Sequence, residues 1–158
     1  MKKSGVTLIG VGLILVAVLI ILACVLIPRI QARARLDEAL AAFMEEDAAY
    51  VLYTDPHYKN EGLLAPDGRD LVLEGELLFE VRSKMSALGA DCKYHSTEKD
   101  AIVGTDKRLM VKRASGESVQ LFFAADCFYL TVGGKTFVFT PADPDAQAAL
   151  LQLLDAAI

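Results

Sequence analysis

The sequence of 158 residues has few of the residue types from which most catalytic and metal sites are built. It contains two histidines, three cysteines and no tryptophan. It has neither a glycine-rich loop of the kind that cradles phosphate groups nor the turn that exposes a nucleophilic serine. Without such a motif the sequence offers no catalytic residue, so we expect the protein not to be an enzyme.

The scarcity of histidine and cysteine also argues against a bound metal. Cys92, His95 and Cys127 together could supply three ligands, the smallest set that a zinc or copper site uses. However, residues three positions apart on a strand point to opposite faces, so Cys92 and His95 are not expected to converge. The same geometry argues against a Cys92 nucleophile with His95 as its base. We therefore predict no metal and no cofactor.

Acidic residues are absent from the first 36 positions, which carry five basic ones: Lys2, Lys3, Arg29, Arg33 and Arg35. The rest of the chain holds the other 11 basic residues and all 21 acidic ones, a net charge of −10. An acidic domain repels the phosphate backbone, so we expect no nucleic acid as a partner. The basic residues suit anionic headgroups, which makes membrane lipid a predicted partner.

No charged residue occurs at positions 5–27, where Thr7 has the only hydroxyl group. As a helix this segment is about 34 Å long, enough to cross the hydrocarbon core of a bilayer. A helix that is apolar on every side over this length has no role in a water-soluble core. The sequence therefore predicts a transmembrane helix at 5–27, preceded by a short basic leader at 1–4.

Basic residues lie on both sides of this helix, so the positive-inside rule alone does not decide its orientation. We expect a single-pass protein of the cell membrane with its N-terminus inside, because the short leader already carries two lysines. The C-terminal domain would then lie outside. An oxidising compartment would allow Cys92 and Cys127 to form a disulfide, the alternative being two buried free thiols.

Two short motifs flank the apolar helix. Residues 2–9 read KKSGVTLI, and residues 27–31 read IPRIQ. The first resembles the basic leader, cleavage glycine and mature start of type IV prepilins, and the second resembles the Ile-Pro pair where pilin helices leave the membrane. The resemblance implies cleavage between Gly5 and Val6, and assembly with other subunits through the apolar helix. Gly10 departs from the family, which usually keeps a glutamate there, although some minor subunits lack it.

Two other interpretations of the same helix stay open. A plain bitopic anchor needs only the length and hydrophobicity already described. Alternatively, Ile21-Leu22-Ala23-Cys24 is similar to a lipobox, which would place a lipid on Cys24 and remove the residues before it. The apolar residues that follow Cys24 differ from the polar tether that usually follows a lipobox.

Beyond the membrane the sequence predicts an α+β fold. Residues 28–53 are expected to form a helical stem, because Leu36, Leu40 and Phe43 share one face with Tyr50 or Val51. Prolines and glycines at 54–70 predict a long loop. Residues 71–158 are expected to form one extracytoplasmic domain.

Within this domain a helix is predicted at 76–88, with Gly89 as its left-handed cap. A second helix is expected from Asp143, a suitable N-cap, and Pro144, a suitable first residue. Between the helices the hydrophobic period changes to two and turn residues recur, which predicts an antiparallel meander. Its strands are expected at 91–96, 101–105, 108–114, 118–124, 127–132 and 135–140.

Residues 81–94 contain Val81-Arg82, Met85 and the run LGADCKY, followed by the strand pattern. This arrangement is similar to the copper amine oxidase N-terminal-like domain over residues 71–140. Despite its name, that family implies a non-catalytic surface or stalk module. The sequence thus supports a membrane-anchored structural or assembly protein of the pilin-like kind, with an anchored surface binding module as the alternative.

Overall fold

The computed structural model describes residues 3–55, 70–99 and 107–158. They divide into two compact units, Met1–Ala34 and Arg35–Ile158. The elements in chain order are α1 (Lys3–Met44), β1 (Tyr50–Thr54), β2 (Asp70–Val72), α2 (Gly75–Ala90), β3 (Cys92–Lys99), β4 (Lys107–Lys112), β5 (Ser118–Phe123), β6 (Phe128–Val132), β7 (Lys135–Pro141) and α3 (Pro144–Asp155).

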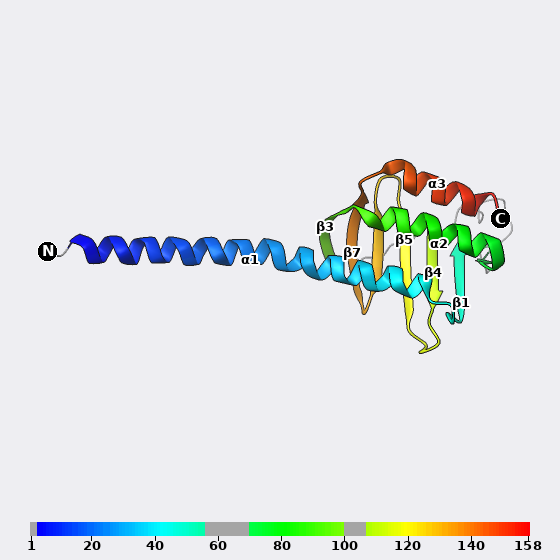
Figure 1. Ribbon diagram of the computed structural model, residues 1–158, viewed down its shortest axis with the longest axis horizontal. Helices are drawn as coiled ribbons and strands as arrows, with labels where there is room; N and C mark the ends of the chain where they lie inside the picture. Colours follow the sequence, from blue (N-terminus) through cyan, green and yellow to red (C-terminus); the bar gives the residue numbers. More distant parts are fainter. Residues whose placement is uncertain (1–2, 56–69, 100–106) are drawn as a thin grey trace. The chain divides into compact units, whose positions relative to one another are not determined.

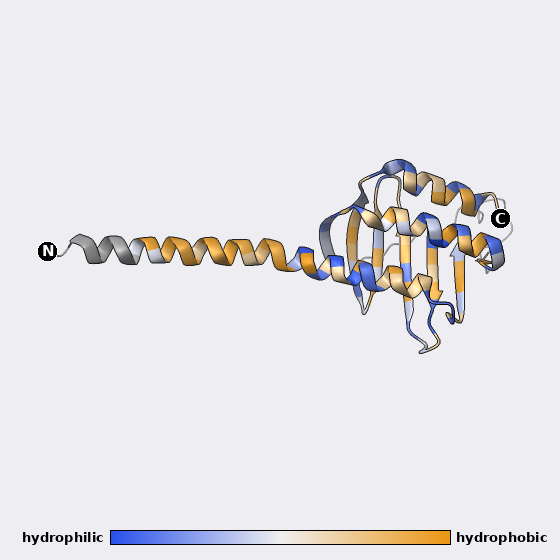
Figure 2. Ribbon diagram, viewed as in Figure 1, coloured by the Kyte–Doolittle hydropathy of each residue, from blue (hydrophilic) through white to orange (hydrophobic). Residues whose placement is uncertain are grey.

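The first unit consists of the N-terminal part of α1. Side chains at residues 11–22 are all apolar and exposed, and none of the helix's most apolar 18-residue window is buried. In Figure 2 the ribbon of this stretch has the orange of hydrophobic residues along most of its length. The helix continues through Pro28 instead of ending there. The prediction of an apolar helix long enough to span a membrane is therefore confirmed.

The second unit begins inside the same helix. Leu36, Ala39 and Phe43 are buried, with 0–1% of each side chain exposed. Their spacing of three and four residues places them on one helical face, which becomes part of the core. The unit therefore begins at Arg35 and not at residue 71, where the sequence predicted the domain to start.

One antiparallel sheet of seven strands, in the order β2-β1-β4-β5-β6-β7-β3, forms the other layer. Strands β4 to β7 form the predicted meander, and β3 pairs with the outer edge of β7. Aligned partners such as Leu109, Leu121 and Leu130 are fully buried on one face of the sheet. The helices α2 and α3 and the end of α1 lie together over the sheet (Figure 1). The α+β prediction is confirmed.

Individual strands agree closely with the sequence pattern from β4 onward. Asp143 caps α3 as predicted, because its carboxylate accepts a hydrogen bond from the Asp145 amide at 3.0 Å. Pro144 is the first residue of that helix. The strand expected at 101–105 and most of the loop expected at 54–70 lie outside the described residues. The two ends of that loop, Thr54 and Asp70, are paired in β1 and β2.

The predicted stem at 28–53 is wrong in its second half. The helix α1 ends at Met44, and Tyr50–Thr54 is strand β1, paired with both β2 and β4. Val51 and Tyr53 are buried while their neighbours are more exposed, which is the alternation of a strand. The aromatic and β-branched residues of this segment suit a sheet better than a helix.

Gly89 is also placed differently from the prediction. It lies inside α2, which continues to Ala90, and it does not adopt a positive φ. A Cβ atom at this position would lie 2.1 Å from Leu40 Cδ1. Gly89 is therefore a point of close approach between α1 and α2 and not a helix cap.

Candidate functional site

The apolar part of α1 is the first candidate site, since its exposed side chains have no covering residues in the described chain. Gly5 and Val6, the predicted processing positions, lie in the first turn of α1. A Cβ atom built on Gly10 or Gly12 meets nothing within 4 Å. Larger side chains can therefore be introduced at both positions without a steric conflict within one chain.

The structure does not contain the predicted disulfide between Cys92 and Cys127. The Cys92 thiol donates a hydrogen bond to the Leu88 carbonyl oxygen at 2.8 Å, as a side chain near a helix end can. Cys92 begins β3 and Cys127 precedes β6, and strand β7 lies between these two strands. Both cysteines lie near the start of a strand, but β3 and β6 are not neighbours in the sheet.

His95 does not join a group of metal ligands. Its Nε2 lies 2.7 Å from the Thr140 hydroxyl oxygen, across the β3–β7 pair. Within the ranges 3–55, 70–99 and 107–158, no group of three or more His, Cys, Asp or Glu side chains is placed to hold a metal ion.

Two arginines fix the end of α1. Arg82 donates hydrogen bonds from Nε to the Phe43 carbonyl oxygen at 2.9 Å and from Nη2 to the Glu45 carbonyl oxygen. Carbonyl groups at a helix C-terminus lack partners within the helix, so the guanidinium group caps α1. Arg113 donates to the Glu45 carboxylate at 3.1 and 3.2 Å. This ion pair lowers the pKa of Glu45 and raises the pKa of Arg113.

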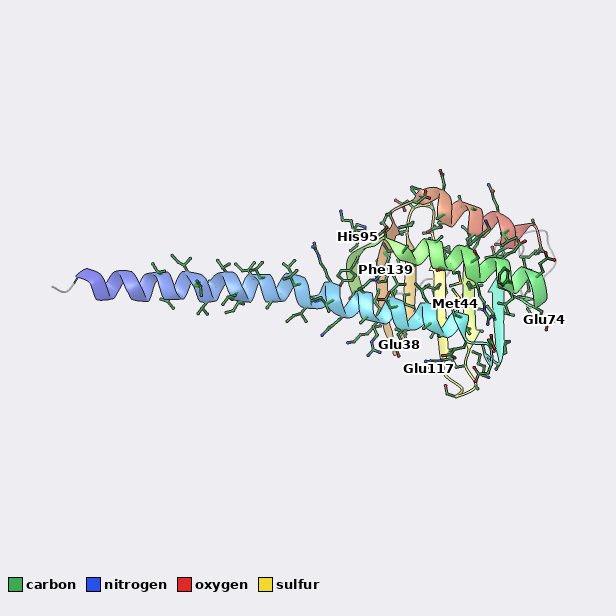
Figure 3. The ribbon with its side chains drawn as sticks, viewed as in Figure 1. Glu38, Met44, Glu74, His95, Glu117 and Phe139 are labelled. Carbon is green, nitrogen blue, oxygen red and sulfur yellow. The ribbon has the colours of Figure 1, made fainter. Side chains whose placement is uncertain are left out.

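A cleft of about 300 Å³ lies beside this cap, between the end of α1, β1, β2 and the start of α2. Figure 3 labels one of the lining residues, Glu74, which precedes α2. The cleft is lined by Glu46, Ala48, Ala49, Tyr50, Val51, Val72, Leu73, Glu74, Gly75, Leu78 and Arg82. Polar and apolar groups both contribute to its walls, and the Glu46 and Glu74 side chains are exposed.

Two exposed apolar side chains line this cleft, and a third lies on α2, the helix whose first residues border it. Tyr50 is 36% exposed and Val72 is 48% exposed, and both line it. Phe79 is 73% exposed and lies four residues after Gly75 and three before Arg82, on the same side of α2 as these two lining residues. These are the only large apolar side chains exposed among the described residues of the second unit. Such a cluster is typical of an interaction surface.

A second polar cluster joins α3 to the sheet. The buried Tyr53 hydroxyl donates to Asp155 Oδ1 at 2.7 Å. Lys107 forms an ion pair with Asp155, and its Nζ lies 3.6 Å from Asp55 Oδ2. Burial, with the carboxylates nearby, raises the pKa of Tyr53 well above its usual range. Because opposite charges are paired within the cluster, we assign it a structural role, which is to connect α3 to the sheet.

Sequence reasoning missed both the cleft and this cluster. Tyr50 lines the cleft and Tyr53 is buried, although only two residues separate them in the sequence. In the acidic run Glu45-Glu46-Asp47, Glu45 is paired with Arg113 and Glu46 lines the cleft.

Comparison of the chain with known proteins finds no matching family model, curated protein or solved structure. The two resemblances noted in the sequence thus remain predictions that rest on their own short motifs.

Proposed function

We propose that this protein is a membrane-anchored subunit of a pilin-like assembly, with its second unit on the outer side of the cell membrane. The observation that carries the proposal is the composition of α1. One helix contains both a fully exposed apolar window and the buried residues Leu36 and Phe43 of the α+β core. A helix of this kind serves as anchor, assembly element and core element at once.

The physical argument begins with the exposed apolar side chains. In water, exposure of so long an apolar surface is unfavourable by about 25 cal/mol for each Å². Lipid tails or the helices of other subunits remove that surface from water. The basic leader, the Gly5-Val6 pair and the Ile27-Pro28 pair add the prepilin resemblance to this requirement. These motifs favour association of α1 with other subunits, as in a pilin-like assembly, over an anchor that has no partners.

A non-catalytic surface binding module is the second candidate, because the cleft beside β2 offers exposed apolar groups within reach of carboxylates. Such a module would use α1 only as an anchor. It would need neither processing at Gly5 nor association between copies.

The first experiment determines the N-terminal residue of the protein extracted from membranes. In cells that process other prepilins, a start at Val6 is expected. A start at Met1 would overturn the pilin-like proposal in favour of the anchored module. A lipid-modified start at Cys24 would instead identify a lipoprotein.

A matched pair of substitutions refines this experiment. Gly10→Glu should increase assembly, because the carboxylate can pair with the new amino terminus of a neighbouring subunit in the apolar bundle. Gly12→Glu is the control, since neither position is sterically restricted but only residue 10 is five residues into the mature chain. The measurement is the yield of high-molecular-weight assemblies in membrane extracts. Equal yields from the two variants would contradict the proposal.

A further inference from the structure

The face of the sheet that points away from the core carries apolar side chains. In β1, β4 and β5 buried residues alternate with partly exposed ones, which therefore point to the opposite face. On that face Leu52 is aligned with Met110, and Phe122 is aligned with Arg108, the residue two positions before Met110. Aligned and diagonal partners of this kind lie within reach of each other, so the three apolar side chains form one area. The outer face of an antiparallel sheet is ordinarily polar, so this area indicates a partner.

Two cations flank the apolar area. Arg108 and Lys112 lie two residues before and after Met110 on β4, so the three side chains point to the same face. Arg108 Nη2 donates to the neutral Thr54 hydroxyl at 3.3 Å, and Lys112 Nζ lies 5.8 Å from the centre of the Tyr50 ring. Among the described residues, neither cation has a carboxylate within ion-pair distance. We call this surface the basic sheet patch, which consists of Leu52, Arg108, Met110, Lys112 and Phe122.

The exposed side of α2 carries the opposite charge. Phe79 is 73% exposed, and Glu76 and Glu80 are exposed beside it. Because successive residues of a helix are about 100° apart, these three lie within about 100° of one another and roughly opposite the buried Val81 and Met85. We call them the acidic helix ridge.

The basic residues of α2 leave this ridge negative. They are Arg82, which is bonded to the carbonyl oxygens of Phe43 and Glu45, and Lys84, which is only partly exposed. The ridge therefore presents an aromatic ring beside two carboxylates, and the basic sheet patch presents apolar groups between two cations. The ridge lies on the outer side of α2 and the patch on the face of the sheet that points away from the core, so one copy cannot bring them together.

We propose that the acidic helix ridge of one copy binds the basic sheet patch of a second copy. The inference rests on the proposed function, because it identifies a contact between subunits of that assembly. In this contact Phe79 covers Met110, and the carboxylates of the ridge pair with the cations of the patch. Helices then cover both faces of the sheet. Since two different surfaces meet, the contact is heterologous, and every copy added leaves one ridge and one patch for the next.

The test is a disulfide crosslink between full-length copies in uncharged detergent micelles. One copy carries Phe79→Cys, and a second copy with a different tag carries Met110→Cys. Serine replaces the three native cysteines in both. On oxidation the two copies should form a linked pair that contains both tags on a non-reducing gel. The matched control replaces Met110→Cys by Asp126→Cys, because residue 126 is exposed but belongs to neither surface.

Charge reversal tests whether the proposed ion pairs hold the contact together. Glu76→Lys with Glu80→Lys in the first copy brings like charges together, as does Arg108→Glu with Lys112→Glu in the second copy. Either change alone should lower the crosslinked fraction about tenfold or more. The two changes together restore opposite charges, and crosslinking should return. Circular dichroism confirms that every variant is folded.

Three results would overturn the contact: equal crosslinking to the Asp126→Cys control, equal crosslinking between two copies that both carry Phe79→Cys, or no recovery when both charge reversals are combined. The result is independent of processing. Mature protein that begins at Val6 and does not crosslink removes this contact and leaves the pilin-like function. Crosslinking that follows the charges in protein that begins at Met1 removes that function and leaves the contact.

Discussion

At the scale of single residues, Tyr53 connects three elements. Its hydroxyl donates to Asp155 at the end of α3, and Lys107 of β4 pairs with the same carboxylate. The Lys107 Nζ also lies 3.6 Å from Oδ2 of Asp55, which is 6% exposed. A buried hydroxyl in contact with a carboxylate is stable only as the neutral phenol, and this requirement gives a pH dependence.

The pKa of Tyr53 is raised in the folded protein, whereas an unfolded tyrosine ionises near pH 10. Above that pH the unfolded chain loses a proton that the folded chain keeps, so the free energy of unfolding decreases as the pH rises. Tyr53→Phe should reduce this alkaline decrease. At pH 7 the substitution should cost about 0.5–1.5 kcal/mol, because the hydrogen bond is lost.

Urea titrations of the full chain in detergent at neutral and alkaline pH measure both effects. Tyr94→Phe is the control, since its hydroxyl is bonded to Thr97 at the surface. The assignment fails if Tyr53→Phe and Tyr94→Phe give the same alkaline profile.

At the scale of elements, the contact between α1 and α2 depends on Gly89. A Gly→Ala change within a helix ordinarily stabilises by about 0.5–1 kcal/mol. At position 89 the added methyl group would lie 2.1 Å from Leu40 Cδ1, so Gly89→Ala is expected instead to destabilise by about 1–3 kcal/mol.

A double-mutant cycle tests this steric cause. In a Leu40→Ala background the conflict disappears, and Gly89→Ala should become neutral or stabilising. Ser86→Ala, at an exposed position of the same helix, is the control. An equal effect of Gly89→Ala in both backgrounds, measured by chemical denaturation, would show that Leu40 is not the obstacle.

The helices and strands also show which parts of the fold could be predicted from the sequence. Helix α2 and strands β4 to β7 were predictable, because alternation and turn residues agreed with each other. Strand β1 was not, because Tyr50 and Val51 also continue the helical face of Leu36 and Phe43. The segment is a strand because it pairs with β4, which lies more than 50 residues later in the sequence and could not be identified as its partner from the local pattern. A helix cap is the ordinary prediction for Gly89, because no sequence pattern places Leu40 beside it.

The cleft could not be predicted from the sequence for a related reason. Its lining comes from the segments 46–51, 72–75 and 78–82, and no motif joins them.

At the scale of the whole molecule, the boundary at Arg35 predicts which fragments fold. A fragment 35–158 keeps Leu36, Phe43, Val51 and Tyr53 in the core. It should unfold cooperatively in urea and be soluble without detergent, because the apolar helix is absent.

A fragment 71–158 is the matched comparison. It lacks the end of α1 and strand β1, which exposes the edge of β4 and removes the buried apolar side chains of Leu36, Ala39, Ala42, Phe43, Val51 and Tyr53. Loss of a large buried side chain typically costs about 2–5 kcal/mol, so this fragment should not fold. Cooperative unfolding of 71–158 in circular dichroism would show that the unit begins later than Arg35.

The continuity of α1 into the core also has a mechanical consequence. When the apolar helix is held and the second unit is pulled, tension passes along the chain directly to Leu36 and Phe43, since no linker separates the helix from the core. There is no slack segment to extend before the load reaches buried contacts. The resistance of the attachment to tension is therefore set by the force needed to strip the end of α1 from the sheet.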